Sequence, residues 1–191
     1  MRLLEDRIRA DGKVKDGDVL KVDGFLNHRI DVRFVAELGR EFYRLYGNCG
    51  INKILTIESS GIGVACLTAQ FFDCPVVFAK KAKTTNIDPD TYTAAVESYT
   101  HGTVNEILVS KEYLGEGDKV LIIDDFLARG SALLGLIELV RKSGAELAGA
   151  GIVIEKAYQD GGKKVRAQGV RVESLARIAS MSVKDGIVFC D

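Results

Sequence analysis

The sequence lacks several features that mark other classes of protein. None of its apolar runs approaches the about 20 residues that a membrane-spanning helix needs, and the charged start Met1–Arg7 does not resemble a secretory signal. Lys plus Arg number 26 against 27 Asp plus Glu, a formal net charge of -1, so neither nucleic acid nor an anionic membrane is an expected partner. No G-x-G-x-x-G follows a predicted strand, which argues against a dinucleotide-binding domain.

Cysteine and histidine are also scarce. The four cysteines, Cys49, Cys66, Cys74 and Cys190, show no C-x-x-C spacing. That pattern fits free thiols in a reducing compartment and predicts a cytoplasmic protein. The two histidines, His28 and His101, have no evident catalytic role.

What is present predicts an α/β fold, with a mostly parallel twisted sheet flanked by helices. The chain has 191 residues, 47% of them hydrophobic, enough for the core of a single domain over residues 1–191. Apolar strand patterns alternate with helical periodicity, as a parallel sheet requires. The predicted strands are Lys53–Ile57, Pro75–Ala79, Thr103–Val109 at an edge, Lys119–Ile123 at the centre, Ala148–Glu155, Val170–Ile178 and Gly186–Phe189. The predicted helices are Asp31–Tyr46, Gly61–Phe72, Ser131–Lys142 and a short one near Gly162–Gln168, while Val14–Phe25 predicts one or two separate strands.

The most informative segment is Val120–Ala132. A buried strand ends at two adjacent carboxylates, Asp124 and Asp125, and a turn of small residues leads into a helix. Glycine lets the backbone approach a ligand, and a helix start offers unpaired N–H groups to a phosphate. Ionised carboxylates accept hydrogen bonds from ribose hydroxyls. The segment therefore predicts a site for a phosphorylated sugar, with the phosphate at Ala128, Arg129, Gly130, Ser131 and Ala132.

A simpler alternative is a surface turn in which Ser131 caps the helix. Two adjacent carboxylates repel each other, however, and a glycine follows them within the same short loop. These two features favour the sugar-phosphate site.

A second loop of the same kind follows the strand Lys53–Ile57. It reads Glu58-Ser59-Ser60-Gly61 and leads into a predicted helix. A capped helix start would explain this loop equally well. Paired with Asp124–Ala132 on a neighbouring strand, the loop becomes informative as a second candidate phosphate site.

The segment Val120–Ala132 resembles the phosphoribosyl-diphosphate (PRPP) signature of the type I phosphoribosyltransferases. Most members end the loop with Thr where this chain has Ala132, and Arg129 replaces a commoner Thr or Asn; the alanine resembles the xanthine branch of the family. The resemblance implies the type I fold, with a hood of approximately residues 1–30 and part of the C-terminal region. It also implies that Ala128–Ala132 bind the 5′-phosphate, and that Ser59, Ser60, Gly61 and Lys81 bind pyrophosphate.

Lys156 is the candidate for recognition of a base. It ends a predicted strand on the same edge as the two loops, and its ammonium group, a donor only, favours a 6-oxo purine over adenine. A lysine at a strand end is more often a solvated charge. The run Ile152–Lys156 nevertheless resembles the base-binding strand end of the xanthine branch, in which Leu20 and Asn27 would complete the pocket. Without the resemblance, Leu20 would be a core residue and Asn27 a turn residue.

The polar stretch Lys80–Tyr99, with three lysines near its start, is expected to be a long connection. It is interpreted as a lid that closes over the substrate and excludes water; the alternative is a solvated loop. Lys80 and Lys81 resemble basic residues that reach pyrophosphate in related enzymes, sometimes across a dimer interface.

Together these features predict an enzyme that transfers the phosphoribosyl group of PRPP to N9 of xanthine. The products would be xanthosine 5′-monophosphate and pyrophosphate, a reaction of purine salvage. Asp124 and Asp125 would be the catalytic residues, and Mg²⁺ would be held mainly by PRPP rather than by protein ligands. The resemblance also implies a homodimer. The alternatives are guanine, hypoxanthine or adenine as the base, or a non-catalytic PRPP-sensing regulator; 191 residues and a charge of -1 leave no room for the DNA-binding domain such regulators usually add.

Overall fold

The computed structural model describes residues 1–81, 89–98 and 103–190. Its main sheet has eight strands in the order β10-β9-β8-β7-β3-β4-β6-β5. Neighbours from β9 to β4 run parallel, and the pairs β9–β10, β4–β6 and β5–β6 are antiparallel. This confirms the mostly parallel sheet. The strands are β3 (Lys53–Ile57), β4 (Val76–Lys81), β5 (Thr91–Ser98), β6 (Thr103–Ser110), β7 (Lys119–Leu127), β8 (Glu146–Lys156), β9 (Val172–Ser182) and β10 (Gly186–Phe189).

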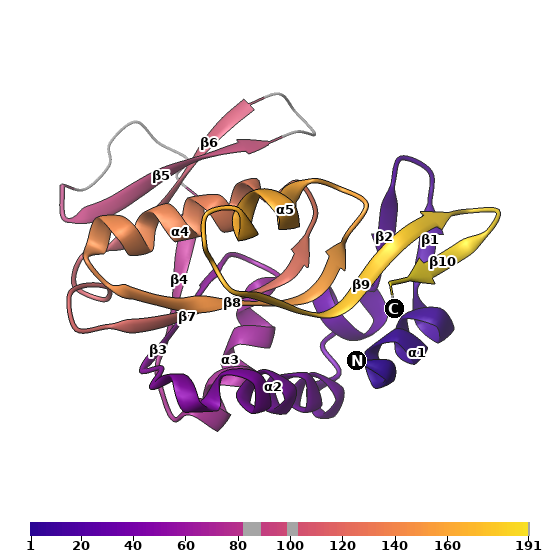
Figure 1. Cartoon of the computed structure of the whole chain (residues 1–191), viewed down its shortest axis with the longest axis horizontal. Helices are drawn as coiled ribbons and strands as arrows, with labels where there is room; N and C mark the ends of the chain where they lie inside the picture. The colour runs from indigo at the N-terminus through magenta and orange to yellow at the C-terminus, as the bar shows by residue number, and fades with distance from the viewer. Residues whose placement is uncertain (82–88, 99–102, 191) are drawn as a thin grey trace.

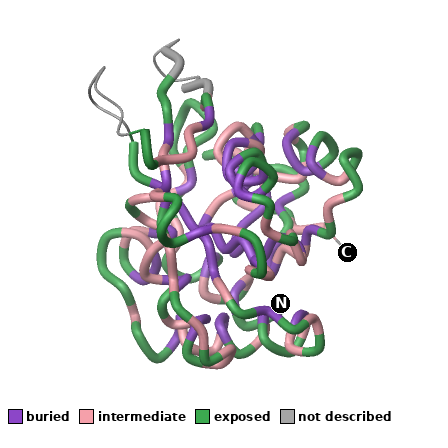
Figure 2. Tube along the Cα trace, turned by 90° about the vertical axis from the view of Figure 1, so that its left-hand side faces the viewer, coloured by how far each residue is buried: buried purple, intermediate pink, exposed green. Residues whose placement is uncertain are grey.

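Helices cover both faces of the sheet (Figure 1). On one face lie α2 (Val32–Tyr46), continued by a 3₁₀ turn at Gly47–Cys49, and α3 (Gly61–Phe72); on the other lie α4 (Ser131–Ser143) and α5 (Gly161–Arg166). The helix α2 forms where the sequence has an apolar stripe, and Asp31 caps it by accepting a hydrogen bond from the N–H of Phe34 at 3.2 Å. Two clusters of buried apolar residues line the two sides of the sheet. Figure 2 shows buried segments inside the molecule and exposed ones around them.

A small N-terminal hood lies at the β9–β10 end of the sheet (Figure 1). It consists of α1 (Arg2–Asp11), the hairpin β1 (Lys13–Lys15) and β2 (Val19–Lys21), and a π-helical turn at Asp23–Asn27. The strands predicted within Val14–Phe25 are confirmed, but the segment ends in a helical turn rather than in a strand. The sequence did not lead us to expect α1, which buries Leu4 and Ile8 against the hood and β9.

The strand β7 is longer than predicted. It runs on to Leu127, so Asp124 and Asp125 lie inside the strand rather than after it. The cause is the neighbouring strand β8, which continues alongside and pairs Leu127 with Glu155. Pairing with β8 therefore extends β7 past the two acidic residues, which the local sequence pattern had placed at its end.

The expectation of a long connection over Lys80–Tyr99 was wrong at Lys80 and Lys81, which end β4, and at residues 91–98. Residues 91–98 form β5, which pairs with β6 along its length. The role of the stretch as a lid stays a prediction. Ala94 is buried beneath α4, so packing on that helix stabilises a strand with few strongly apolar residues. For the same reason the edge position expected for Thr103–Val109 was wrong, because β6 lies between β4 and β5. Residues 82–88 and Tyr99 lie outside the described residues.

Within the described part of the chain, no helix is long and apolar enough to cross a membrane. The four cysteines are all free.

Candidate active site

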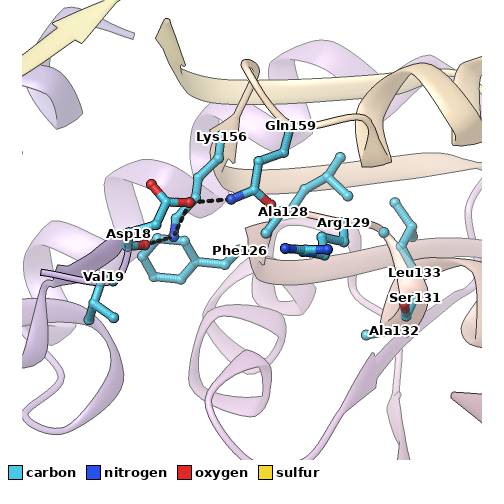
Figure 3. A pocket seen from close by; sticks show the side chains of 13 residues that line it. Asp18, Val19, Phe126, Ala128, Arg129, Ser131, Ala132, Leu133, Lys156 and Gln159 are labelled. Carbon is cyan, nitrogen blue, oxygen red and sulfur yellow. Dashed lines mark hydrogen bonds and ion pairs between the residues drawn. The ribbon is translucent and has the colours of Figure 1, made fainter. Parts of the chain in front are cut away.

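A cavity of about 520 Å³ opens at the carboxyl ends of β7 and β8. It brings together two features that were predicted separately, the loop Ala128–Ala132 and Lys156 (Figure 3). The remaining walls come from the end of β7, the start of α4, the segment after β8 and the tip of the hood hairpin. They are formed by Phe126, Leu127, Leu133, Gln159, Gly17, Asp18 and Val19.

The loop Ala128–Ala132 has the shape of an anion-binding turn. Gly130 has φ +86°, a conformation that side chains disfavour, and its carbonyl oxygen accepts the first bond of α4 from the N–H of Leu134 at 2.9 Å. The amides of residues 131–133 therefore stand at the exposed start of the helical hydrogen-bond pattern. Ser131 is the first helical residue and makes no capping bond. The alternative of Ser131 as a helix cap is wrong, and its hydroxyl remains on the cavity wall.

Asp124 and Asp125 are almost buried, with 5% and 7% of their surfaces exposed. The Oδ1 atom of Asp124 accepts from the N–H of Asp125 at 3.0 Å, and Oδ1 of Asp125 accepts from the N–H of Phe126 at 3.0 Å. Burial, reinforced by the neighbouring charge of Asp125, raises the pKa of Asp124 well above its ordinary value. A ligand that brings positive charge to this position would relieve that cost.

The loop Ser59–Gly61 lies next to Asp124. The Glu58–Ser59 peptide bond is cis, and Gly61 is the first residue of α3. A Cβ atom on Gly61 would overlap Thr56 Oγ1 and would lie 3.0 Å from Asp124 Oδ1. The predicted pyrophosphate loop thus faces the acidic pair, although it does not line the cavity of about 520 Å³.

Lys81 ends β4 beside this loop. Its N–H donates to Oε1 of Glu58 at 2.6 Å, and its positive charge acts on Asp124 by lowering the pKa of that carboxyl, against the larger effect of burial. The side chain of Lys81 is exposed. The positive charge of Lys81 therefore interacts with the carboxyl group of Asp124.

Lys156 is the last residue of β8, and 12% of its side chain is exposed. Its Nζ donates to the backbone carbonyl of Asp18 and lies 3.9 Å from that residue's Oδ2 atom. Burial lowers the pKa of Lys156, and the charge of Asp18 opposes this effect. The lysine is therefore held at the cavity wall as a directed donor rather than as a freely solvated charge.

The other two residues assigned to the base come from the hood. Leu20 is 6% exposed and packs in the core, and Asn27 closes the π-helical turn with its Oδ1 atom buried and without a hydrogen-bond partner in the described residues. Neither lines the cavity of about 520 Å³. The structure thus brings Lys156 and the phosphate loop together, whereas Leu20, in β2, and Asn27, in the turn after it, lie outside the lining of this cavity.

Seven residues of the cavity were not expected from the sequence, among them Asp18, Phe126 and Gln159. Phe126 directly follows the acidic pair and offers an aromatic surface on which a planar base can stack. The run Asp16-Gly17-Asp18 has the composition of a turn and could have indicated a hairpin tip. Its contact with the segment after β8 could not be predicted, because the two are far apart in sequence.

The described residues contain no group of three or more His, Cys, Asp or Glu side chains that would hold a metal ion. The adjacent carboxylates of Asp124 and Asp125 do fit Mg²⁺ bound chiefly through substrate oxygens, because that ion commonly takes one or two carboxylates, substrate phosphates and water.

The family model for the phosphoribosyl transferase domain matches residues 22–182. The chain belongs to this family. It is 55% identical to a xanthine phosphoribosyltransferase of Lachnoclostridium phytofermentans, over 98% of this chain and 97% of that protein. It is likewise 55% identical to a xanthine phosphoribosyltransferase of Clostridium novyi, over 95% of each.

Solved structures of the family share the fold. An adenine phosphoribosyltransferase of Giardia lamblia, solved with 9-deazaadenine, superposes with a TM-score of 0.78 at 24% identity, over 91% of this chain and 97% of that one. An adenine phosphoribosyltransferase of Rhodothermus marinus gives a TM-score of 0.75 at 24% identity, over 92% and 98%. The expectation of a type I phosphoribosyltransferase fold is confirmed. Members of the family generally use PRPP together with Mg²⁺.

Proposed function

We propose that this protein transfers the 5-phosphoribosyl group of PRPP to N9 of xanthine, giving xanthosine 5′-monophosphate and pyrophosphate in purine salvage. One observation carries the proposal: the loop Ala128–Ala132 and Lys156 form the wall of one cavity, at the end of the strand that holds Asp124 and Asp125. The candidate subsites for the phosphate (Ala128–Ala132), the ribose (Asp124 and Asp125) and the purine (Lys156) therefore lie close to one another. The 55% identity to proteins named xanthine phosphoribosyltransferase supports the same base.

In this proposal the 5′-phosphate of PRPP binds to Ala128, Arg129, Gly130, Ser131 and Ala132. The amides at the start of α4 and the Ser131 hydroxyl donate to its oxygens, and the helix dipole favours its negative charge. Pyrophosphate, the leaving group, binds at Ser59, Ser60 and Gly61 with Lys81. The adjacency of Gly61 and Asp124 supports this order, because it sets the leaving group and the ribose side by side.

Asp124 and Asp125 act on the ribose. Their oxygens accept from its hydroxyls and stabilise the positive charge that develops as the bond from C1′ to the pyrophosphate oxygen stretches. The lone pair of N9 then forms the new bond to C1′, the electron pair of the broken bond leaves with pyrophosphate, and the imidazole N–H proton of the base passes to solvent water. The charge of Lys81 and the loop amides offset the negative charge on the leaving group.

Mg²⁺ would be held mainly by PRPP, with Asp124 and Asp125 as the nearest protein carboxylates. It would supply neutralisation of the diphosphate charge. The raised pKa of Asp124 supports a role for that residue beside a cationic group, because such a group would favour the ionised carboxylate.

The base would lie over Phe126, with Lys156 donating to the 6-oxo group. Leu20 and Asn27 would complete the pocket from the hood, as the resemblance to the xanthine branch implies. The buried, unpartnered Oδ1 atom of Asn27 supports a polar role for this residue, since an amide left unsatisfied is costly in a core.

We also propose a homodimer. Exposed apolar side chains, Phe78 and Tyr113, border a groove of about 680 Å³ along β4 and β6. The same groove carries Lys80 and Glu112, so the surface is self-complementary in charge, which suits contact with a second copy across a two-fold axis. Lys80 immediately precedes Lys81, and such a contact would place the second copy close to the pyrophosphate subsite.

The remaining expectations are retained as parts of the proposal. A single domain over residues 1–191 is supported by one apolar cluster that joins Leu4 and Ile8 of the hood to Ile178 of the sheet. A cytoplasmic location is supported by four unpaired cysteines, which persist in reducing compartments.

The test is to incubate the pure protein with PRPP, Mg²⁺ and each of xanthine, guanine, hypoxanthine and adenine, and to measure the nucleotide formed. Xanthosine monophosphate as the preferred product is the expected result. Preference for another base would retain the transferase and overturn the base assignment. PRPP binding without product from any base would favour a regulator.

A further inference from the structure

Asp18 ties the tip of the hood hairpin to the segment that follows β8. Its backbone carbonyl accepts from Nζ of Lys156, and its Oδ2 atom accepts from Nε2 of Gln159 (Figure 3). Its Oδ1 atom accepts from the Tyr158 hydroxyl. Asp18 adopts φ +65°, which aspartate tolerates better than most residues. One residue of the hood therefore holds three residues at the edge of the cavity.

This contact fixes the orientation of the Gln159 amide. An ionised carboxylate only accepts hydrogen bonds, so the NH₂ group of Gln159 must face Asp18 and the amide oxygen must point the other way. Figure 3 shows the nitrogen of Gln159 directed at Asp18 and the oxygen turned away from it. The carboxylate thus determines which end of the amide is available to a ligand.

The available end is an acceptor without a partner. Oε1 of Gln159 is buried and forms no hydrogen bond within the described residues, and Gln159 lines the same cavity as Lys156. A buried acceptor left unpaired costs free energy, so a ligand that donates at this position gains by satisfying it. The cavity wall therefore presents a donor, Nζ of Lys156, and an acceptor, Oε1 of Gln159, both anchored to Asp18.

We propose that Gln159 determines base specificity, with Oε1 accepting the ring N–H beside the 6-oxo group held by Lys156. Asp18 is the positioning residue that orients the pair. The inference rests on the proposed function, because it names two further residues of the same base subsite.

The pairing distinguishes two classes of purine. A 6-oxo purine presents an acceptor at C6 and a donor at N1, which complement the lysine and the amide oxygen. Adenine presents a donor at C6 and an acceptor at N1, so both contacts become repulsive or unpaired. Sites that pair with a polar group reject analogues lacking it strongly, because their own groups are left unsatisfied.

The test compares Gln159→Leu with the wild type by two measurements: kcat/KM for xanthine, and the inhibition constant of adenine against xanthine turnover. Removing the amide should lower kcat/KM for xanthine by about 10- to 100-fold. The inhibition constant of adenine should stay the same or fall, because a repulsive contact with N1 is lost. Gln168→Leu, at an exposed position after α5, is the matched control and should change neither value.

Asp18→Asn is the second variant. Asparagine tolerates the positive φ but no longer forces the Gln159 amide into one orientation. It should lower the preference for xanthine over adenine, by less than Gln159→Leu does. Asp16→Asn, an exposed aspartate in the same turn, is its control.

The specificity role would be overturned if Gln159→Leu weakened adenine binding as much as it lowered kcat/KM for xanthine. It would also be overturned if the preference for xanthine over adenine stayed the same in both variants. Such a result with an active wild-type enzyme would leave the transferase proposal intact. Absence of xanthine turnover in the wild type would instead count against the proposed function. If Gln159→Leu fails to fold, judged by its thermal unfolding, Asp18→Asn decides the question.

Discussion

Gly61 and Asp124 approach each other so closely that a Cβ atom on Gly61 would lie 3.0 Å from Oδ1 of Asp124. The glycine begins α3 and the aspartate lies in β7, so the contact joins the ends of two neighbouring parallel strands. It holds the predicted pyrophosphate loop against the acidic pair.

Replacing Gly61 with alanine should disable the site. The new methyl group would collide with Thr56 Oγ1 and crowd Asp124, so the loop or the carboxylate must shift. Misplacement by about 1 Å can cost about 100-fold in rate, and kcat/KM for PRPP should fall by that order. Gly115→Ala is the matched control, because nothing lies within 4 Å of a Cβ there. Near wild-type kinetics in Gly61→Ala would show that the loop takes no part in substrate binding.

Asp124→Asn should stabilise the free protein while it lowers turnover. Burial raises the pKa of Asp124, so the folded state loses stability relative to the unfolded state as the pH rises above the unfolded pKa of about 4. Asparagine removes this penalty, so urea unfolding at pH 7.5 should show a higher free energy of unfolding for Asp124→Asn than for the wild type.

The gain from Asp124→Asn should shrink as the pH is lowered toward 4, where the aspartate in both states becomes protonated. Turnover should fall by at least about 100-fold, because a group that stabilises developing charge is neutralised. The double variant with Asp125→Asn should be slower still. Near wild-type activity in that double variant would contradict the role of the acidic pair.

Glu155→Gln should destabilise the fold. This glutamate is 2% exposed and accepts from Arg166 at 2.7 and 2.9 Å and from Ser174 at 2.6 Å. Breaking one side of a buried ion pair costs about 3 kcal/mol, partly offset here by the exposure of the arginine. Glu173→Gln, which removes an exposed pair with Arg171, should cost less than about 1 kcal/mol. Urea unfolding of both variants measures the difference.

The Glu155 contribution should also depend on pH. Burial opposes ionisation, but the hydrogen bonds from Arg166 and Ser174, with the arginine charges, outweigh it and hold the pKa below its ordinary value. The stabilisation is therefore present above the unfolded pKa of about 4.3 and is lost as the pH falls through the lower folded value. A difference in the free energy of unfolding between the wild type and Glu155→Gln that stays constant from pH 7 to pH 3 would contradict this.

Lys156→Met should impair use of the base and leave PRPP binding intact. Methionine keeps most of the apolar stem but removes the donor, so KM for xanthine should rise by about 10-fold or more. The dissociation constant of PRPP should not change. Lys184→Met, at an exposed position, is the control. Equal weakening of PRPP binding would show that Lys156 serves the whole cavity rather than the base.

The parts of the site that the sequence predicted well are local. The apolar run of β7, the acidic pair, the loop with Gly130 and the start of α4 are contiguous, and each follows from short-range rules of burial and turn conformation. The same rules predicted β3 and the loop before α3. The family resemblance then added the ligand and the base.

The predictions that were wrong concern segments whose structure depends on contacts with residues distant in the sequence. Residues 91–98 became a strand because β6 and α4 cover them, and β7 extended past Asp125 because β8 runs beside it. The contact between Asp18 and Gln159 joins residues 141 apart, and no local pattern signals it.

The sequence by itself determined most of the alternation of strands and helices and the two turns that precede α3 and α4, because these arise from backbone sterics and apolar periodicity over a few neighbouring residues. Only the tertiary structure decided how the hood closes on the sheet, which end of the Gln159 amide faces the cavity, and how strongly burial shifts the pKa of Asp124. Those properties depend on which surfaces meet, and chain segments remote in sequence supply the surfaces.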